Sequence, residues 1–165
     1  MISRWLEVAA RIRAEVADLD WVARRVDRFW HAAAKARADR DAYLDAVALN
    51  LQSFYSGIER LFELIARHVD EAMPGGETWH RDLLRQMARE IEGRRPAVIS
   101  EASAAGLEMC RRFRHLIRNL YAMDLAPERM APVVEGVPHL WARAQPELLA
   151  FAGFLDDLAR SASGA

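Results

Sequence analysis

Apolar residues recur at intervals of three and four along most of this chain, which is the spacing of one face of an α-helix. The first series predicts a long helix packed lengthwise on a partner, with apolar positions Trp5, Ala9, Ile12, Val16, Leu19, Ala23, Val26, Trp30 and Ala33. A break at residues 18–20, with Asp20 as an N-cap, is the alternative interpretation. A turn follows at residues 38–41, where Asp39 or Asp41 can cap the next helix.

The second series is wide enough to place its helix at the centre of a bundle. Its apolar positions are Leu44, Val47, Ala48, Leu51, Phe54, Tyr55, Ile58, Leu61, Phe62, Ile65 and Val69. Residues 74–76, Pro-Gly-Gly, end this helix, and Thr78 can cap a third one. The apolar positions of that third helix are Leu83, Leu84, Met87 and Ile91.

Gly93 and Pro96 separate the third helix from a fourth, which is expected to end near Met123. The apolar positions of the fourth helix are Ile99, Ala102, Gly106, Met109, Phe113, Leu116 and Leu120. Short helices are expected in the tail, opened by Pro127, Pro138 and Pro146. The last should run to about Ala159 through Leu148, Phe151, Ala152, Leu155 and Leu158, with residues 161–165 frayed.

The strand signal is missing, because no window of five or more residues alternates apolar with polar and Thr78 is the only threonine. We therefore predict an all-α fold, an antiparallel helical bundle of about five to six helices. The 165 residues, 52% of them hydrophobic, are enough for one domain spanning residues 1–165.

Composition restricts the class of protein further. The single cysteine excludes a disulfide framework and a multi-cysteine metal site, and it favours a reducing compartment. Neither a signal peptide nor a membrane span is evident, so we expect a cytoplasmic protein that does not bind membranes. The net charge of -1 means that any nucleic-acid site must be local. The basic residues are almost all arginine. Two explanations fit this bias: recognition of phosphate groups, or a GC-rich genome.

Metal and acid–base chemistry find little support in the residue spacing. The histidines never pair at i and i+4, and Glu77-x-x-His80 is only half of a di-iron signature, so no metal site and no cofactor are predicted. His80 is interpreted as packing or hydrogen bonding locally. Glu59 and Glu63 share a helix face with Arg60 and Arg67, which is typical of a solvated charge ladder. Cys110, beside apolar positions, is interpreted as a small buried residue.

One stretch of the fourth helix is unusually polar. It holds Arg111, Arg112, Arg114, His115, Arg118, Asn119 and Tyr121. On a helical wheel Arg114, Arg118 and Tyr121 form one stripe beside the apolar face, while His115 and Asn119 lie one turn apart on another. The stretch is either a solvated arginine face or a cluster that holds a phosphodiester, with His115 as the proton acceptor. Both interpretations predict exposed arginines.

Residues 113–121, FRHLIRNLY, resemble the R-x4-H-x-Y signature of HepT-like toxins in the HEPN ribonuclease superfamily. The resemblance continues upstream in residues 51–62 and 79–84, and downstream in residues 124–125 and 128–129. It covers roughly residues 41–129, while the first helix and the tail agree in pattern only. Several separated matches in order are more specific than one arginine–histidine spacing.

The resemblance implies a helical homodimer that cuts RNA without a metal, in a cleft where the two motif helices meet. Arg114 matches the motif arginine, and Arg111 and Arg118 are candidate RNA-binding residues beside it. Tyr121 matches the tyrosine that an MNT-type nucleotidyltransferase antitoxin modifies with AMP in such toxin–antitoxin pairs. Asn119 stands where the motif has its histidine.

An asparagine amide cannot take a proton near pH 7, so the Asn119 position leaves two interpretations open. In the first, the protein is an endoribonuclease whose catalytic residues are Arg114, Asn119 and His115, with His115 supplying the base. In the second, it is a non-catalytic helical partner of the nucleotidyltransferase.

Overall fold

The regular structure of the described residues is helical, apart from an isolated bridge between Ile91 and Arg95. The computed structural model describes residues 2–118 and 125–164. The elements are α1 (Ile2–Lys35), α2 (Arg40–Ile65), the π-helical η1 (Ala66–Asp70), α3 (Trp79–Met87), α4 (Glu101–Arg118), α5 (Pro127–Val134) and α6 (Val137–Ser163). The predicted all-α fold is confirmed. No helix in the described ranges is long and apolar enough to cross a bilayer.

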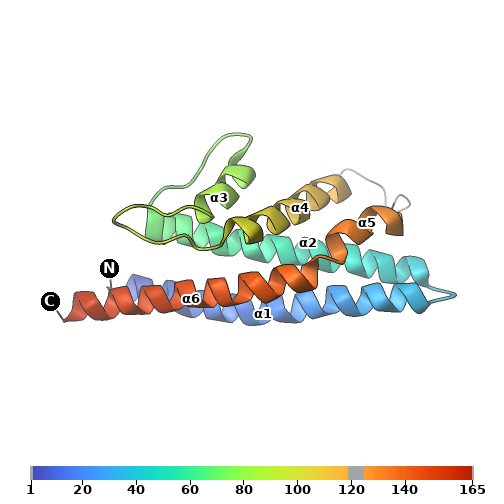
Figure 1. The fold of residues 1–165 in the computed structure, drawn as a ribbon, viewed down its shortest axis with the longest axis horizontal. Helices are drawn as coiled ribbons and strands as arrows, with labels where there is room; N and C mark the ends of the chain where they lie inside the picture. Colours follow the sequence, from blue (N-terminus) through green and yellow to red (C-terminus); the bar gives the residue numbers. More distant parts are fainter. Residues whose placement is uncertain (1, 119–124, 165) are drawn as a thin grey trace.

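The long helix α1 packs along both α2 and α6, which run antiparallel to it (Figure 1). The predicted apolar face is confirmed, since the positions from Ala9 to Val26 are buried and Trp5 and Trp30 pack at its edge. The alternative break at residues 18–20 does not occur. Asp20 instead accepts a hydrogen bond from Trp141 Nε1 at 3.0 Å, which fastens α6 to the middle of α1.

Helix α2 is the centre of the bundle, as its wide apolar face predicts. Phe54, Tyr55 and Phe62 are almost fully buried on it. It approaches α1 so closely at Gly57 that a β-carbon there would lie 2.7 Å from Leu19 Cδ2. A larger residue at this position would therefore force the Leu19 side chain on α1 to move.

The predicted N-cap positions are right for two helices, although neither side chain caps the backbone. Asp39 precedes α2 in a left-handed conformation with φ of 61°, and Thr78 precedes α3. The Thr78 hydroxyl donates instead to the Asp82 carboxylate at 2.6 Å. Asp82 therefore accepts a hydrogen bond from the residue that precedes its own helix. The same carboxylate also lies near Arg81 and Arg85.

The tail differs from the prediction at its last helix. Pro127 and Pro138 do open α5 and α6, but Pro146 lies inside α6, which continues as one helix to Ser163. The proline removes one N–H bond to Ala142, and because both residues are exposed, water can satisfy that carbonyl. The expected fraying of residues 161–165 is wrong for those up to Ser163.

Helix α4 buries a different face from the predicted one. Its buried residues are Ser103, Leu107, Cys110, Phe113 and Arg114. Met109 and Leu116, predicted to be core residues, are 45% and 42% exposed. The apolar series misplaces the face because two buried residues are polar. Ser103 Oγ accepts a hydrogen bond from Ser100 Oγ at 3.3 Å, and Arg114 donates to Glu59.

A fully buried ion pair holds the connection between α3 and α4. Arg95 Nε and Nη2 donate to the two Asp70 carboxylate oxygens at 2.5 and 2.7 Å, and Gln86 Nε2 donates to Asp70 Oδ2 at 2.6 Å. The chain then comes back to α3, where the N–H of Val98 donates to the Met87 carbonyl at 2.9 Å. Helix α4 thus starts beside the end of α3 and runs back along it.

Candidate active site

The motif arginine, Arg114, does not lie on the surface as the sequence predicted. It is only 5% exposed, and it points from α4 towards α2. Its Nη1 and Nη2 donate to Oε1 and Oε2 of Glu59, each at 3.1 Å, in a two-pronged ion pair. Glu59 is 7% exposed, so its assignment to a solvated charge ladder is also wrong.

Two neighbours of Glu59 on α2 also contact the Arg114 guanidinium. The ring of Tyr55, one turn before Glu59, lies under the guanidinium with its centroid 4.6 Å from Cζ. Ser56 Oγ accepts a longer bond from Nη1 at 3.4 Å. Burial, and then the Glu59 charge, raise the pKa of Tyr55, so its phenol stays neutral.

His80, at the start of α3, shares the same carboxylate. Its Nδ1 lies 2.6 Å from Glu59 Oε2. An ionised carboxylate only accepts, so Nδ1 carries the hydrogen and the 3.4 Å approach of Arg114 Nη2 to Nδ1 is not a hydrogen bond. The ring stacks on Trp79 at 3.6 Å, and the His80 side chain is 32% exposed. The stack on Trp79 confirms the local packing expected for His80, but its hydrogen-bond partner Glu59 lies 21 residues earlier in the chain.

This arrangement has the parts of a general base. Nδ1 of His80 donates its hydrogen bond to Glu59. In the neutral ring the free lone pair is therefore on Nε2, and this atom can accept a proton. Glu59 fixes the ring and stabilises the imidazolium that forms, as the carboxylate does in a serine protease triad. Arg114 holds Glu59 in place and balances its charge.

A protein-family model, described as HepT-like protein, matches residues 46–155. The chain belongs to the HepT-like family. Comparison with curated proteins and with solved structures found no match. The HepT-like match runs from α2 into α6 and contains Glu59, His80 and Arg114, while α1 lies outside it. The resemblance to HepT-like proteins of the HEPN superfamily is thereby confirmed.

The other predicted site residues of this HepT-like chain lie apart from the Glu59 cluster or beyond the described residues. Arg111 donates to Glu108 twice, at 2.7 and 2.8 Å. Arg118 and His115 are exposed on α4. Asn119 and Tyr121, with the predicted helix end at Met123, fall outside the described ranges. Of the predicted catalytic residues that the structure describes, Arg114 contacts Glu59 of the Glu59–His80 pair.

Two further predictions are confirmed. Cys110 is 1% exposed, and burial raises its pKa to about 12, so the thiol is not a nucleophile at neutral pH. Glu63 pairs with Arg67 one turn later at 2.9 Å, a solvated ladder as expected. The described residues contain no group of three or more histidine, cysteine or acidic side chains placed to hold a metal.

The sequence holds a signal for the burial of Glu59, which its interpretation as part of a solvated charge ladder misses. It lies on α2 among Tyr55, Ile58 and Phe62, on a face otherwise made of buried apolar residues. A carboxylate in such a position needs a buried partner. The contribution of His80 depends on how α3 packs against α2, which no local pattern specifies.

Proposed function

We propose that this HepT-like protein is a metal-independent endoribonuclease, the toxin of a HEPN/MNT toxin–antitoxin pair, and that it acts as a homodimer. The observation that carries the proposal is the Glu59–His80 pair, held by the motif arginine Arg114. It supplies the proton acceptor that Asn119 cannot provide.

In the proposed reaction, His80 Nε2 takes the proton of a ribose 2′-hydroxyl, whose oxygen then attacks the adjacent phosphorus. The O2′–P bond forms and the P–O5′ bond breaks, which leaves a 2′,3′-cyclic phosphate. The departing 5′-oxygen takes a proton from water. Exposed cations of α4, Arg118 among them, stabilise the charge on the phosphoryl oxygens. Arg114 acts through Glu59 as a positioning residue.

The direct test is cleavage of single-stranded RNA by the purified protein with excess EDTA present. Products should end in a 5′-hydroxyl and a 2′,3′-cyclic phosphate, and EDTA should leave the rate unchanged. Absence of cleavage by protein that carries no AMP would reject the nuclease. The Asn119 substitution favours the alternative, a non-catalytic partner of an MNT-type nucleotidyltransferase. AMP on Tyr121 after coexpression with that enzyme, without cleavage by the unmodified protein, would support it.

The homodimer is supported by the exposed apolar side chains of α4. Met109 and Leu116 lie two turns apart on one face, with exposed Ala102 continuing the line. A monomer would leave this face in water, whereas a second copy could cover it.

We therefore expect the double variant Met109→Glu and Leu116→Glu to be monomeric at micromolar concentration, where the unmodified protein is a dimer. Carboxylates facing each other across a two-fold axis repel and stay hydrated. Light scattering after size-exclusion chromatography gives both masses. Leu149→Glu, an exposed leucine on α6, is the control and should leave the dimer intact. A dimer that persists in the double variant would place the interface elsewhere.

A further inference from the structure

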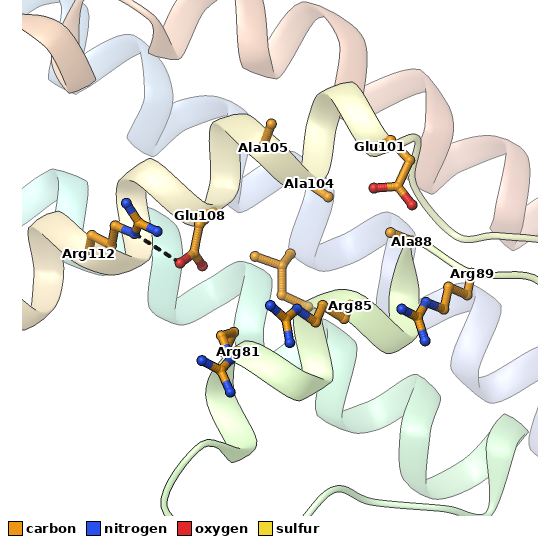
Figure 2. A pocket seen from close by; sticks show the side chains of 10 residues that line it. Arg81, Arg85, Ala88, Arg89, Glu101, Ala104, Ala105, Glu108 and Arg112 are labelled. Atoms are coloured by element: carbon orange, nitrogen blue, oxygen red, sulfur yellow. Dashed lines mark hydrogen bonds and ion pairs between the residues drawn. The ribbon is translucent and has the colours of Figure 1, made fainter.

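A groove of about 390 Å³ lies between α3 and α4, and arginines dominate its walls. Arg81 and Arg85 come from α3, and Arg89 follows just beyond the end of that helix. Figure 2 shows Arg81 and Arg85 on the side of Glu108 and Arg112 of α4, with Arg89 and Glu101 towards the other end of the groove. The Glu59–His80–Arg114 cluster does not use these side chains.

We propose that this groove binds the phosphate backbone of single-stranded RNA and leads the strand to the motif end of α4. The proposal rests on the proposed function, for which it supplies the substrate path. Arg81 and Arg85 stand one helical turn apart on α3, and Arg89 follows four residues later, so like charges lie near one another and repel. A polyanion along the groove removes that repulsion.

The hydrogen-bond donors of the α3 arginines are largely available to a ligand. The nearest carboxylate is that of Asp82, 3.7 Å from Arg81 Nε and 3.9 Å from Arg85 Nη1. Both distances exceed that of a hydrogen bond, and Asp82 already accepts from Thr78. Guanidinium groups in this state can bind phosphate oxygens in pairs.

The acidic residues in the groove do not cancel its positive charge. Glu108 accepts two bonds from Arg111, behind the groove wall, and one from Arg112 at 3.1 Å. Arg111 above all holds the pKa of Glu108 below its usual value, so this carboxylate is ionised and already matched. The four groove arginines then outnumber the two remaining carboxylates, Glu101 in the groove and Asp82 beside it.

The shape of the charge pattern favours a strand over a small anion. Arg81 and Arg85 lie about 6 Å apart along α3, and Arg89 follows four residues later beyond the helix end, so a repeating phosphate chain can engage all three. A single phosphate reaches one or two. None of the ten lining residues is aromatic, so the groove offers no stacking platform for bases. The groove should therefore contribute affinity with little sequence preference.

The groove lies beside the proposed active site along the chain, although Glu59, His80 and Arg114 are not among its lining residues. Arg81 directly follows His80 in the chain, and Arg112 precedes Arg114 by two residues. The groove-lining positions of α4, among them residues 104, 108 and 112, extend along the same helix face to His115. A strand lying on the arginines is thus directed towards the motif.

The test measures RNA binding without cleavage. A fluorescent oligouridine with 2′-O-methyl groups cannot be cut through its 2′-oxygen, and its anisotropy reports binding at several salt concentrations. We expect the triple variant R81Q/R85Q/R89Q to bind at least about tenfold more weakly. The slope of log affinity against log salt should fall by about two, since each phosphate contact in a single strand contributes about 0.7.

The matched control is R11Q/R37Q/R143Q, which removes three exposed arginines away from the groove and changes the net charge equally. Circular dichroism checks that both variants fold. Equal loss of binding in the two variants, or none in the groove variant, would overturn the proposal. So would displacement of the oligonucleotide from the unmodified protein by equimolar inorganic phosphate or ATP, because the ligand would then be a small anion.

Failure of this inference is distinguishable from failure of the proposed nuclease. A groove variant that binds and cuts RNA like the unmodified protein would reject the groove alone. An unmodified protein that binds the oligonucleotide through the groove, but leaves ordinary RNA uncut, would reject the nuclease alone.

Discussion

Replacing Glu59 by alanine is expected to lower the free energy of unfolding by about 3–5 kcal/mol, because it leaves the buried Arg114 guanidinium without a partner. Arg114 is 5% exposed and cannot reach solvent without moving out from between α2 and α4. The same substitution also removes the partner of His80. Urea unfolding followed by circular dichroism measures the loss.

Glu63→Ala is the matched control, one turn further along the same helix. Its ion pair with Arg67 is solvated, with side-chain exposures of 27% and 59%, so we expect a loss of only about 0.2–0.5 kcal/mol. Equal losses at both positions would show that the buried pair does not hold α4 to α2. The double variant Glu59→Leu with Arg114→Met should be more stable than Glu59→Ala, because it leaves no unpaired charge inside.

This burial also changes how an Arg114 variant is interpreted. Because both sequence interpretations predict an exposed Arg114, the sequence predicts that Arg114→Ala abolishes cleavage with little loss of folding. The structure contradicts the second half, because removing Arg114 leaves the buried Glu59 with only His80 as a partner. Loss of RNA cleavage in that variant therefore reports on catalysis only where unfolding curves show that the protein is still folded.

The helices could be predicted from the sequence because a buried helix face repeats every three to four residues whatever it packs against. The face of α4 could not. Its buried Ser103 and Arg114 are satisfied by partners far along the chain or in the preceding turn, and its exposed Met109 and Leu116 are apolar. A pattern of residue types identifies burial only where the buried residues are apolar.

The candidate site, like the fold, could be predicted from the sequence only in part. Arg114 was found through a motif, which is a local pattern. Glu59 and His80 acquire their roles from the packing of α2 against α3, with 21 residues between them. The groove arginines at steps of four are visible in the sequence, but the facing Arg112 and Glu108 are brought opposite them only by the turn that Asp70 and Arg95 hold.

The largest effect on RNA cleavage is expected from replacing His80 by alanine. If its Nε2 is the base, His80→Ala should lower kcat for RNA cleavage by about 10²- to 10⁴-fold, with KM changed much less, because the ring acts on the proton in the transition state. The side chain is a third exposed, so the variant should remain folded, which its unfolding curve checks. Exposed His139→Ala, on α6, is the control.

Two companion variants separate His80 from the other candidate base. His115→Ala should retain most of the activity, since His115 is not needed to take the 2′-proton in this mechanism. Glu59→Gln keeps the shape but offers an amide in place of the carboxylate, so the imidazolium loses its stabilising charge and kcat should fall well below that of the unmodified protein. The opposite pattern, with activity lost in His115→Ala and kept in His80→Ala, would move the base to the exposed face of α4. Glu59 and Arg114 would then only join the helices.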